Sequence, residues 1–419
     1  MPELSTDHSS ATLDGAHSHG GPRYVSSRAD RPTSFDPADI PVPRGREEEW
    51  RFTPMKRFAP LFDLDAIRAA TAGQSDAGVR IETDLPDGVS LETVARSDAR
   101  IGTVGAPVDR TGVTAWNGTE TATVLTLEAG AQLERAARLN IVGQDAQLAR
   151  PTAQHILIAA EAGSKGTVVL DHTGTAALTQ GVEVTVADGA ELTLVTVQGW
   201  EDGAVHASNH RVKVSGRGVL KHVVVSLGGD VRICPDLGFS GEGGHIDAYG
   251  VYFTDAGQHQ EHRPYVAHTE PHCYSRVAYK GALQGEGAHA VWVGDCLIGH
   301  AARGTDTYEL NRNLVLTEGA KADSVPNLEI ENGNIEGAGH ASATGRFDDE
   351  QLFYLRARGI TEIEARRLVV LGFFNEIVAE IGVDEVEERL MAAIEKELEL
   401  TGLITARTDQ DPAAQPAAE

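Results

Sequence analysis

Short apolar runs separated by glycine turns fill the middle of the chain, from residue 101 to residue 345. The runs are rich in β-branched side chains, which favour strands over helices. The clearest examples are Thr121–Leu127, Thr167–Leu170, Val182–Val186, Glu191–Val197 and Val219–Val225. This region is therefore predicted to consist of many short strands.

One kind of turn, a glycine preceded by an acidic residue or alanine, recurs between these strands. The glycines at positions 130, 163 and 189 are 33 and 26 residues apart, and those at 287 and 319 are 32 apart. Such a spacing is typical of a β-solenoid, in which each coil turns a corner at a residue with positive φ. A sandwich or a barrel also uses short strands. However, the chain lacks a clear series of the two-residue turns that join hairpins, so the β-solenoid is preferred.

The N-terminal part has a different composition. Residues 1–20 are rich in Ser, His, Gly and Asp and are predicted to be a disordered tail. Residues 21–100 are predicted to form a helical region, with one helix between Pro43 and Pro54 and a short helix over Asp65–Ala70.

Helical periodicity returns in residues 346–407, which we predict to be a C-terminal helical domain, followed by a disordered tail over residues 408–419. A first helix ends at Gly359, and Thr361 with Glu364 forms a capping box for the second. A third helix is expected to begin near Asp384.

The second of these helices has an apolar face. Spacings of three and four residues place the following side chains together: Leu368, Leu371, Phe374 and Val378. This face could pack against the β core of the same chain or bind a partner protein, and both interpretations stay open.

Charge and cysteine content narrow the function. Lys and Arg total 36 and Asp and Glu total 62, giving a formal charge of −26, which argues against a nucleic-acid-binding protein. The sequence contains no apolar run long enough for a membrane span and no apolar signal segment at its start. The three cysteines form no CxxC pair, as in a reducing compartment. We therefore expect a cytoplasmic protein.

Two places carry candidate metal-binding chemistry. The first is a cluster of soft and borderline ligands suited to zinc or iron, namely His259, Glu261, His262, His268, His272 and Cys273. These side chains could equally belong to ordinary strands. The second is His340, whose small neighbours leave its imidazole accessible as a metal ligand.

Several enzyme signatures are missing. The glycine-rich segment 241–244 is not followed by the Lys of a phosphate-binding loop, and no GxSxG motif is present. A β-solenoid could be a polysaccharide lyase or hydrolase, although no array of acidic residues stands out. That enzyme class and a stand-alone metal-binding protein are the alternative functions.

Three C-terminal segments resemble the core of the SufB/SufD family, the scaffold subunits of bacterial and plastid iron–sulfur cluster assembly. They are Pro326–Ile330, His340–Gly345 and Asp348–Gly359, and the last, with its Gln351-Leu-Phe-Tyr-Leu run, is the most specific. The chain is more similar to SufD than to SufB. It lacks the cysteine that SufB carries just before the first segment, here residues 320–324, and Ala341 stands after His340 where SufB tends to have Glu.

The resemblance implies a right-handed parallel β-helix between helical N-terminal and C-terminal domains. It implies a non-catalytic scaffold subunit that builds and transfers nascent clusters with a SufB-type subunit and a SufC-type ATPase, and that could form a homodimer when alone. The C-terminal helices would dock the ATPase through Leu368, Leu371, Phe374 and Val378. His340 would lie near the SufB interface as a candidate iron ligand for a transient Fe–S cluster, with no intrinsic cofactor expected.

Overall fold

The computed structural model describes residues 28–71, 78–347 and 349–400. The chain divides into two units, residues 1–31 and residues 32–419. In the first unit the described residues form one turn of 3₁₀ helix, η1 (Arg28–Asp30). The two predicted disordered tails, residues 1–20 and 408–419, lie outside the described residues.

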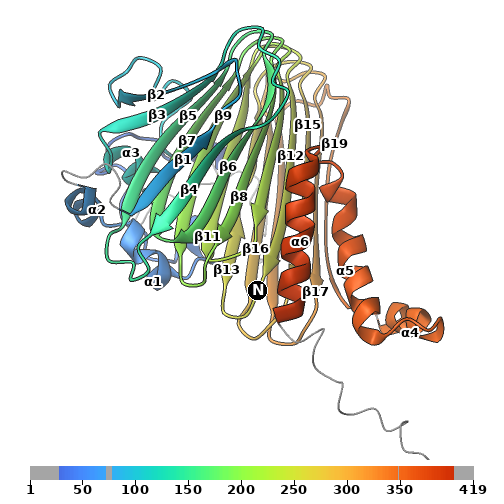
Figure 1. Cartoon of the computed structure of the whole chain (residues 1–419). Helices are drawn as coiled ribbons and strands as arrows, with labels where there is room; N and C mark the ends of the chain where they lie inside the picture. Colours follow the sequence, from blue (N-terminus) through green and yellow to red (C-terminus); the bar gives the residue numbers. More distant parts are fainter. Residues whose placement is uncertain (1–27, 72–77, 348, 401–419) are drawn as a thin grey trace, which may run out of the picture. The chain divides into compact units, whose positions relative to one another are not determined.

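The second unit is built on a parallel β-helix of about eight turns, which confirms the predicted fold. Successive strands alternate between two sheets, and each sheet grows by one strand per coil (Figure 1). The first sheet contains β4 (Ala137–Gln144), β6 (Lys165–Thr175), β8 (Glu191–Trp200), β10 (Val219–Ser226), β12 (His245–Thr254), β15 (Tyr274–Leu283), β17 (Asp306–Val315) and β19 (Gly337–Arg346). The second contains β3 (Thr121–Leu127), β5 (Thr152–Ala160), β7 (Ala177–Val186), β9 (Val205–Ser215), β11 (Asp230–Ser240), β13 (His259–His262), β14 (Tyr265–His268), β16 (His289–Ile298) and β18 (Lys321–Ile330).

The core lies between the two sheets and consists mainly of Val, Leu, Ile and Ala side chains. The coils turn at the predicted glycines, because Gly130, Gly163 and Gly189 have φ values of 72°, 69° and 70°. Gly287 and Gly319 adopt the same left-handed conformation. These corners are therefore confirmed as the reason for the glycine repeat.

The two ends of the β-helix differ. At the start, β1 (Val79–Asp84) pairs antiparallel with β4, and β2 (Val89–Ala95) pairs antiparallel with β3. These strands occupy part of the region that the sequence predicts to be helical. At the other end, β18 and β19 form the last coil, and among the described strands each pairs with one neighbour only, β16 and β17.

Short helices from the N-terminal part pack on the outer face of the second sheet. They are η2 (Glu48–Trp50), α1 (Met55–Phe58), η3 (Ala59–Leu61), α2 (Leu64–Thr71) and, after β2, α3 (Arg110–Asn117). Trp50 and Phe58 share a buried cluster with Val205 of β9. The predicted short helix over residues 65–70 lies within α2, whereas the helix predicted between Pro43 and Pro54 is a single 3₁₀ turn.

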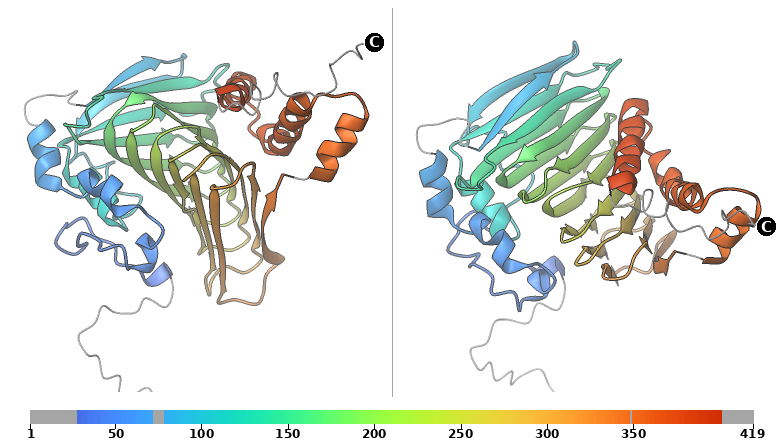
Figure 2. Two further views of the ribbon diagram at one scale, coloured as in Figure 1. Left: turned by 90° about the horizontal axis from the view of Figure 1, so that it is seen from below. Right: turned by 60° about the horizontal axis from the view of Figure 1, so that its bottom comes forward.

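The second and third C-terminal helices pack on the outer face of the first sheet, and the first of them contacts the second. The helices are α4 (Asp349–Ala357), α5 (Glu362–Val378) and α6 (Asp384–Leu400), and α5 and α6 lie side by side along the sheet (Figure 2). Gly359 after α4 has a φ of 85°, and the Thr361 hydroxyl accepts a hydrogen bond from the Glu364 amide at 3.3 Å, as predicted. Within residues 28–71, 78–347 and 349–400, no helix has both the length and the apolar character needed to cross a membrane.

Candidate functional site at the open end of the β-helix

His340 lies on β19, in the last coil of the β-helix. In the β17–β19 register it is opposite Glu309, whose side chain is buried inside the helix, whereas the alternate residues Tyr308 and Arg312 are exposed. Because side chains alternate between the faces of a strand, His340 belongs to the row that faces inward. It is nevertheless exposed. Its imidazole is therefore available at the mouth of the β-helix.

A polar network holds the strands of this last coil together. Asn313 on β17 is its centre, with its Nδ2 2.9 Å from Ser324 Oγ on β18 and 3.3 Å from Thr344 Oγ1 on β19. The buried Tyr252 hydroxyl donates a hydrogen bond to Asn313 Oδ1. Buried polar groups that satisfy one another in this way fix the position of the strands, so the row carrying His340 has a defined geometry.

The three cysteines are not placed to bind a metal ion at this end of the β-helix. Cys234, Cys273 and Cys296 are all buried and free. Burial raises the pKa of Cys234 and of Cys296 to about 12, with the nearby Glu309 carboxylate adding to the shift at Cys296. These raised pKa values favour the neutral thiol, whereas the thiolate is the form that binds a metal. Among the described residues no group of three or more His, Cys, Asp or Glu side chains is arranged to hold a metal ion.

The four predicted partner-binding side chains of α5 have different environments. Phe374 and Val378 are buried in a cluster with valines of the first sheet, Leu371 is half-buried, and Leu368 is 42% exposed. On α4, Phe353 and Tyr354 are 74% and 57% exposed. The sequence prediction did not select these two aromatic residues, although they stand together in the same specific motif.

Comparison with known proteins identifies the family of this chain. The sequence model described as SUF system FeS cluster assembly, SufBD core domain, matches residues 141–373. An iron–sulfur cluster assembly SufBD family protein of Mycobacterium tuberculosis is 49% identical over 375 residues, covering 88% of this chain and 92% of that protein. This chain belongs to the SufBD family. A further SufBD family protein, from Mycobacterium leprae, is 47% identical over 375 residues, with 88% of this chain and 93% of that protein covered. The iron–sulfur cluster assembly protein SufD of Bacillus subtilis is 29% identical over 251 residues, 58% of this chain and 57% of that protein.

The histidine-rich cluster predicted from residues 259–273 is not one site in this SufBD-family chain. His262 and His268 point into the β-helix, where their Nε2 atoms lie 2.9 Å from Ser226 Oγ and 2.8 Å from Ser275 Oγ. His259 lies on the same strand as His262 but at the opposite parity, so the two imidazoles face opposite sides of the sheet. His272 is an exposed turn residue with a φ of 53°. The six side chains therefore do not converge on one point.

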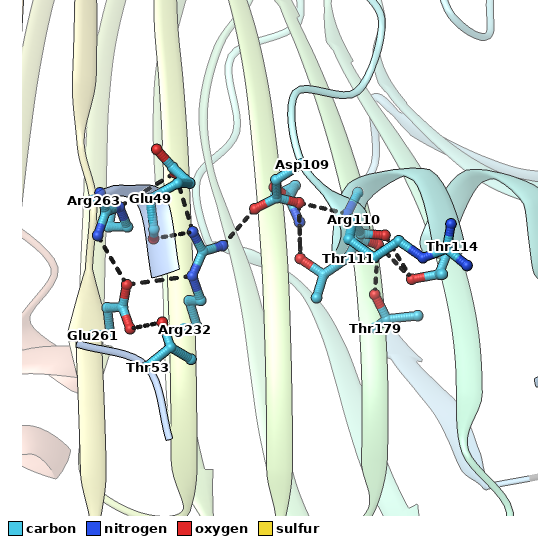
Figure 3. A network of polar contacts seen from close by, with 12 residues as sticks. Glu49, Thr53, Asp109, Arg110, Thr111, Thr114, Thr179, Arg232, Glu261 and Arg263 are labelled. Carbon is cyan, nitrogen blue, oxygen red and sulfur yellow. Dashed lines mark hydrogen bonds and ion pairs between the residues drawn. The ribbon is translucent and has the colours of Figure 1, made fainter. Parts of the chain in front are cut away.

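A buried charge cluster attaches the N-terminal segment to the second sheet (Figure 3). The fully buried Arg232 guanidinium donates hydrogen bonds to Asp109 Oδ2, to Glu49 Oε1 at 3.1 Å and to Glu261 Oε1 at 3.3 Å. Thr53 Oγ1 donates to the other oxygen of Glu261 at 2.7 Å. Burial alone would raise the pKa of Glu261, but Arg232, the hydrogen bond from His259 and Arg263 lower it below its usual value. Sequence reasoning missed this cluster because its members come from four distant segments.

Proposed function

We propose that this SufBD-family chain is a SufD-type scaffold subunit without catalytic activity of its own, and that it works in the cytoplasm with a SufB-type subunit and a SufC-type ATPase. The observation that carries the proposal is the open last coil, where His340 stands exposed on the inward row of β19. The absence of a cysteine from residues 320–324 and the similarity to a SufD protein favour the SufD-type role over the SufB-type role.

A partner at the open end would complete the site. A strand edge presents backbone N–H and C=O groups that can pair with another strand. A second β-helix paired there would cover the row of His340 and could bring thiolate ligands, which the buried cysteines of this chain do not supply. Imidazole and thiolate are both good ligands for iron. The proposed role of His340 is to bind iron of a transient cluster shared between the two subunits.

The C-terminal helices offer a second surface for the ATPase. Leu368, Phe353 and Tyr354 are exposed apolar side chains on α5 and α4, while Phe374 and Val378 hold α5 on the β-helix. We assign Leu368, with the two aromatic residues, to direct contact with the partner. In this proposal Leu371, Phe374 and Val378 contribute by fixing the helix.

Reconstituted cluster assembly tests the role of His340. The complex of this chain with SufB-type and SufC-type proteins would be compared with a His340→Ala complex under an iron and sulfide supply. We expect the variant complex to form normally and to assemble cluster more than about ten times more slowly, the order of loss seen when groups that tune a metal site are removed. The matched control is His300→Ala, another exposed imidazole. Assembly by the His340→Ala complex at the control rate would refute the role.

Co-purification tests the two surfaces separately. Ala343→Lys places a charge on the exposed edge strand β19 and should abolish capture of the SufB-type subunit, whereas Ser90→Lys on β2 at the opposite end should not. Leu368→Asp combined with Phe353→Asp should abolish capture of the ATPase, whereas Val42→Asp, at another exposed apolar position, should not. Retention of both partners by the β19 and helix variants would contradict the proposal.

A further inference from the structure

Two histidines from neighbouring coils face each other on the outer side of the second sheet. His259 on β13 and His289 on β16 are register partners, and their Nδ1 atoms are 3.2 Å apart. The ring centroids are 5.0 Å apart with an interplanar angle of 62°, so the rings meet through their edges instead of stacking. The two Nδ1 atoms are therefore directed at one small volume.

The outer nitrogen of each ring contacts a carboxylate. His259 Nε2 lies 3.1 Å from Glu261 Oε2, and His289 Nε2 lies 2.7 Å from Asp323 Oδ2. Each carboxylate also faces a cationic side chain, because Arg232 Nε lies 3.3 Å from Glu261 Oε1 and Lys321 Nζ donates a hydrogen bond to Asp323 Oδ2. An ionised carboxylate only accepts hydrogen bonds. Each Nε2 must therefore carry the ring proton.

With its proton on Nε2, each ring directs the lone pair of Nδ1 toward the other ring. Two lone pairs that face each other across 3.2 Å repel. The arrangement becomes favourable when a cation lies between the two nitrogens.

We propose that His259 and His289 bind one divalent transition-metal ion through their Nδ1 atoms. With metal–nitrogen distances of about 2.0–2.1 Å, the observed separation corresponds to an N–metal–N angle of about 100–105°, close to tetrahedral. A carboxylate on the far nitrogen is the usual partner of a metal-binding imidazole, because it fixes the tautomer and raises the basicity of the ring. Imidazole ligands suit zinc and iron(II).

The surroundings leave room for water to complete the coordination. The His289 and Asp323 side chains are 23% and 22% exposed, so the site is open on their side. The Phe58 ring stands edge-on to His259, with its centroid 6.1 Å away, and His259 itself is buried. Two protein ligands plus water agree with the finding that the described residues contain no group of three or more potential ligands around one point. The site is separate from His340 and does not depend on the proposed scaffold role.

Cobalt titration of the full-length chain tests the proposal. The background variant carries His8→Ala, His17→Ala and His19→Ala, which removes competing imidazoles near the N-terminus. After chelator treatment, we expect a single equivalent of Co²⁺ to bind with visible absorption typical of nitrogen ligands. His289→Ala should weaken binding by more than about ten-fold. His245→Ala is the matched control, because His245 Nε2 also lies 2.9 Å from a carboxylate oxygen, of Asp247, but its ring stacks on Tyr274 instead of facing a second imidazole.

Two further measurements keep the test decisive. Circular dichroism checks that His289→Ala is folded, and Asp323→Asn, which keeps both ligands, should bind Co²⁺ at intermediate affinity. Nitrogen NMR of the histidine rings should show both Nδ1 signals shifting with Zn²⁺. The proposal is overturned if the background chain binds Co²⁺ no more tightly than His289→Ala, or if a proton stays shared between the two Nδ1 atoms throughout the metal titration.

Discussion

Arg232 shows how one residue can join two parts of the chain. Its guanidinium is fully buried, contacts Asp109 before α3 and Glu49 in η2, and lies 3.9 Å from the centroid of the Trp50 ring. A buried charge of this kind is tolerated because opposite charges and hydrogen bonds surround it. The buried carboxylates that surround Arg232 would in turn be destabilised if the arginine were removed.

Replacing Arg232 with alanine is expected to lower the free energy of unfolding by about 3–5 kcal/mol, because Asp109 would remain buried without its counter-charge and Glu261 would keep only Arg263. Urea denaturation followed by tryptophan fluorescence would measure the loss. The matched control is Arg217→Ala, whose largely exposed ion pair with Asp188 spans 3.9 Å and should contribute little. Equal stability of the two variants would contradict the assigned role of Arg232.

At the residue scale, the sequence predicted what depends on neighbours in the chain. The Thr361 cap, the termination at Gly359 and the left-handed corner glycines were all predicted, because each is decided within a few residues. His289 was not recognised as the partner of His259, because they are 30 residues apart and meet only through the coil register.

At the scale of elements, α5 illustrates how far periodicity can be used. The spacing of apolar residues correctly placed Phe374 and Val378 on one face, but it could not tell whether the face meets the β core or another protein. The structure places both side chains against the valines of the first sheet, including Val195, Val223 and Val251. Lys280 on β15 adds a hydrogen bond to the Phe373 carbonyl at 3.0 Å.

Phe374→Ala is expected to destabilise the chain by about 3–5 kcal/mol, because it leaves a cavity between α5 and the sheet. Leu368→Ala, on the exposed side of the same helix, should change stability very little. Hydrogen exchange should show faster exchange in α5 and α6 of the Phe374 variant, while the β-helix strands keep their protection. A larger loss of stability from Leu368→Ala than from Phe374→Ala would contradict the packing of α5 described above.

At the scale of the whole molecule, histidines inside the β-helix couple its stability to pH. Burial lowers the pKa of His172 and of His222 to about 4, and that of His262 and of His268 to about 3. The same side chains have a pKa of about 6.5 when unfolded. Below pH 6.5 the unfolded chain therefore binds more protons than the folded chain, and stability falls as the pH falls toward 4.

Between pH 6.5 and pH 5, each of these four histidines is expected to lower the free energy of unfolding by about 2 kcal/mol. The four contributions together are comparable to the whole stability of many domains. Urea denaturation at pH 7, 6 and 5 should show a steep decline, in a range where most carboxylates do not yet titrate. His222→Gln should reduce the slope, and His300→Gln, at an exposed position, should leave it unchanged. A flat profile from pH 7 to pH 5 would refute the prediction.

The parallel stack was predictable from the glycine spacing, but the polar interior and the strands β1 and β2 were not. A repeat pattern predicts the length of each coil and the positions of its corners. Whether a histidine faces inward or outward depends on its exact place in the alternation of side chains along the strand. The antiparallel strands fall in a segment whose charged and irregular sequence favoured helix, and their pairing with β3 and β4 decides their structure.

The different ends of the β-helix also limit how copies or relatives of this chain can assemble. If both ends of the β-helix could pair with a further parallel coil, the subunits would assemble into a filament, because each added subunit would again expose a free end. Here β1 and β2 reverse the strand direction at one end, so a further parallel coil finds no template there. These two strands therefore prevent the parallel stack from being extended at that end. If the proposed association through β18 and β19 takes place, it is then expected to stop at a pair of subunits.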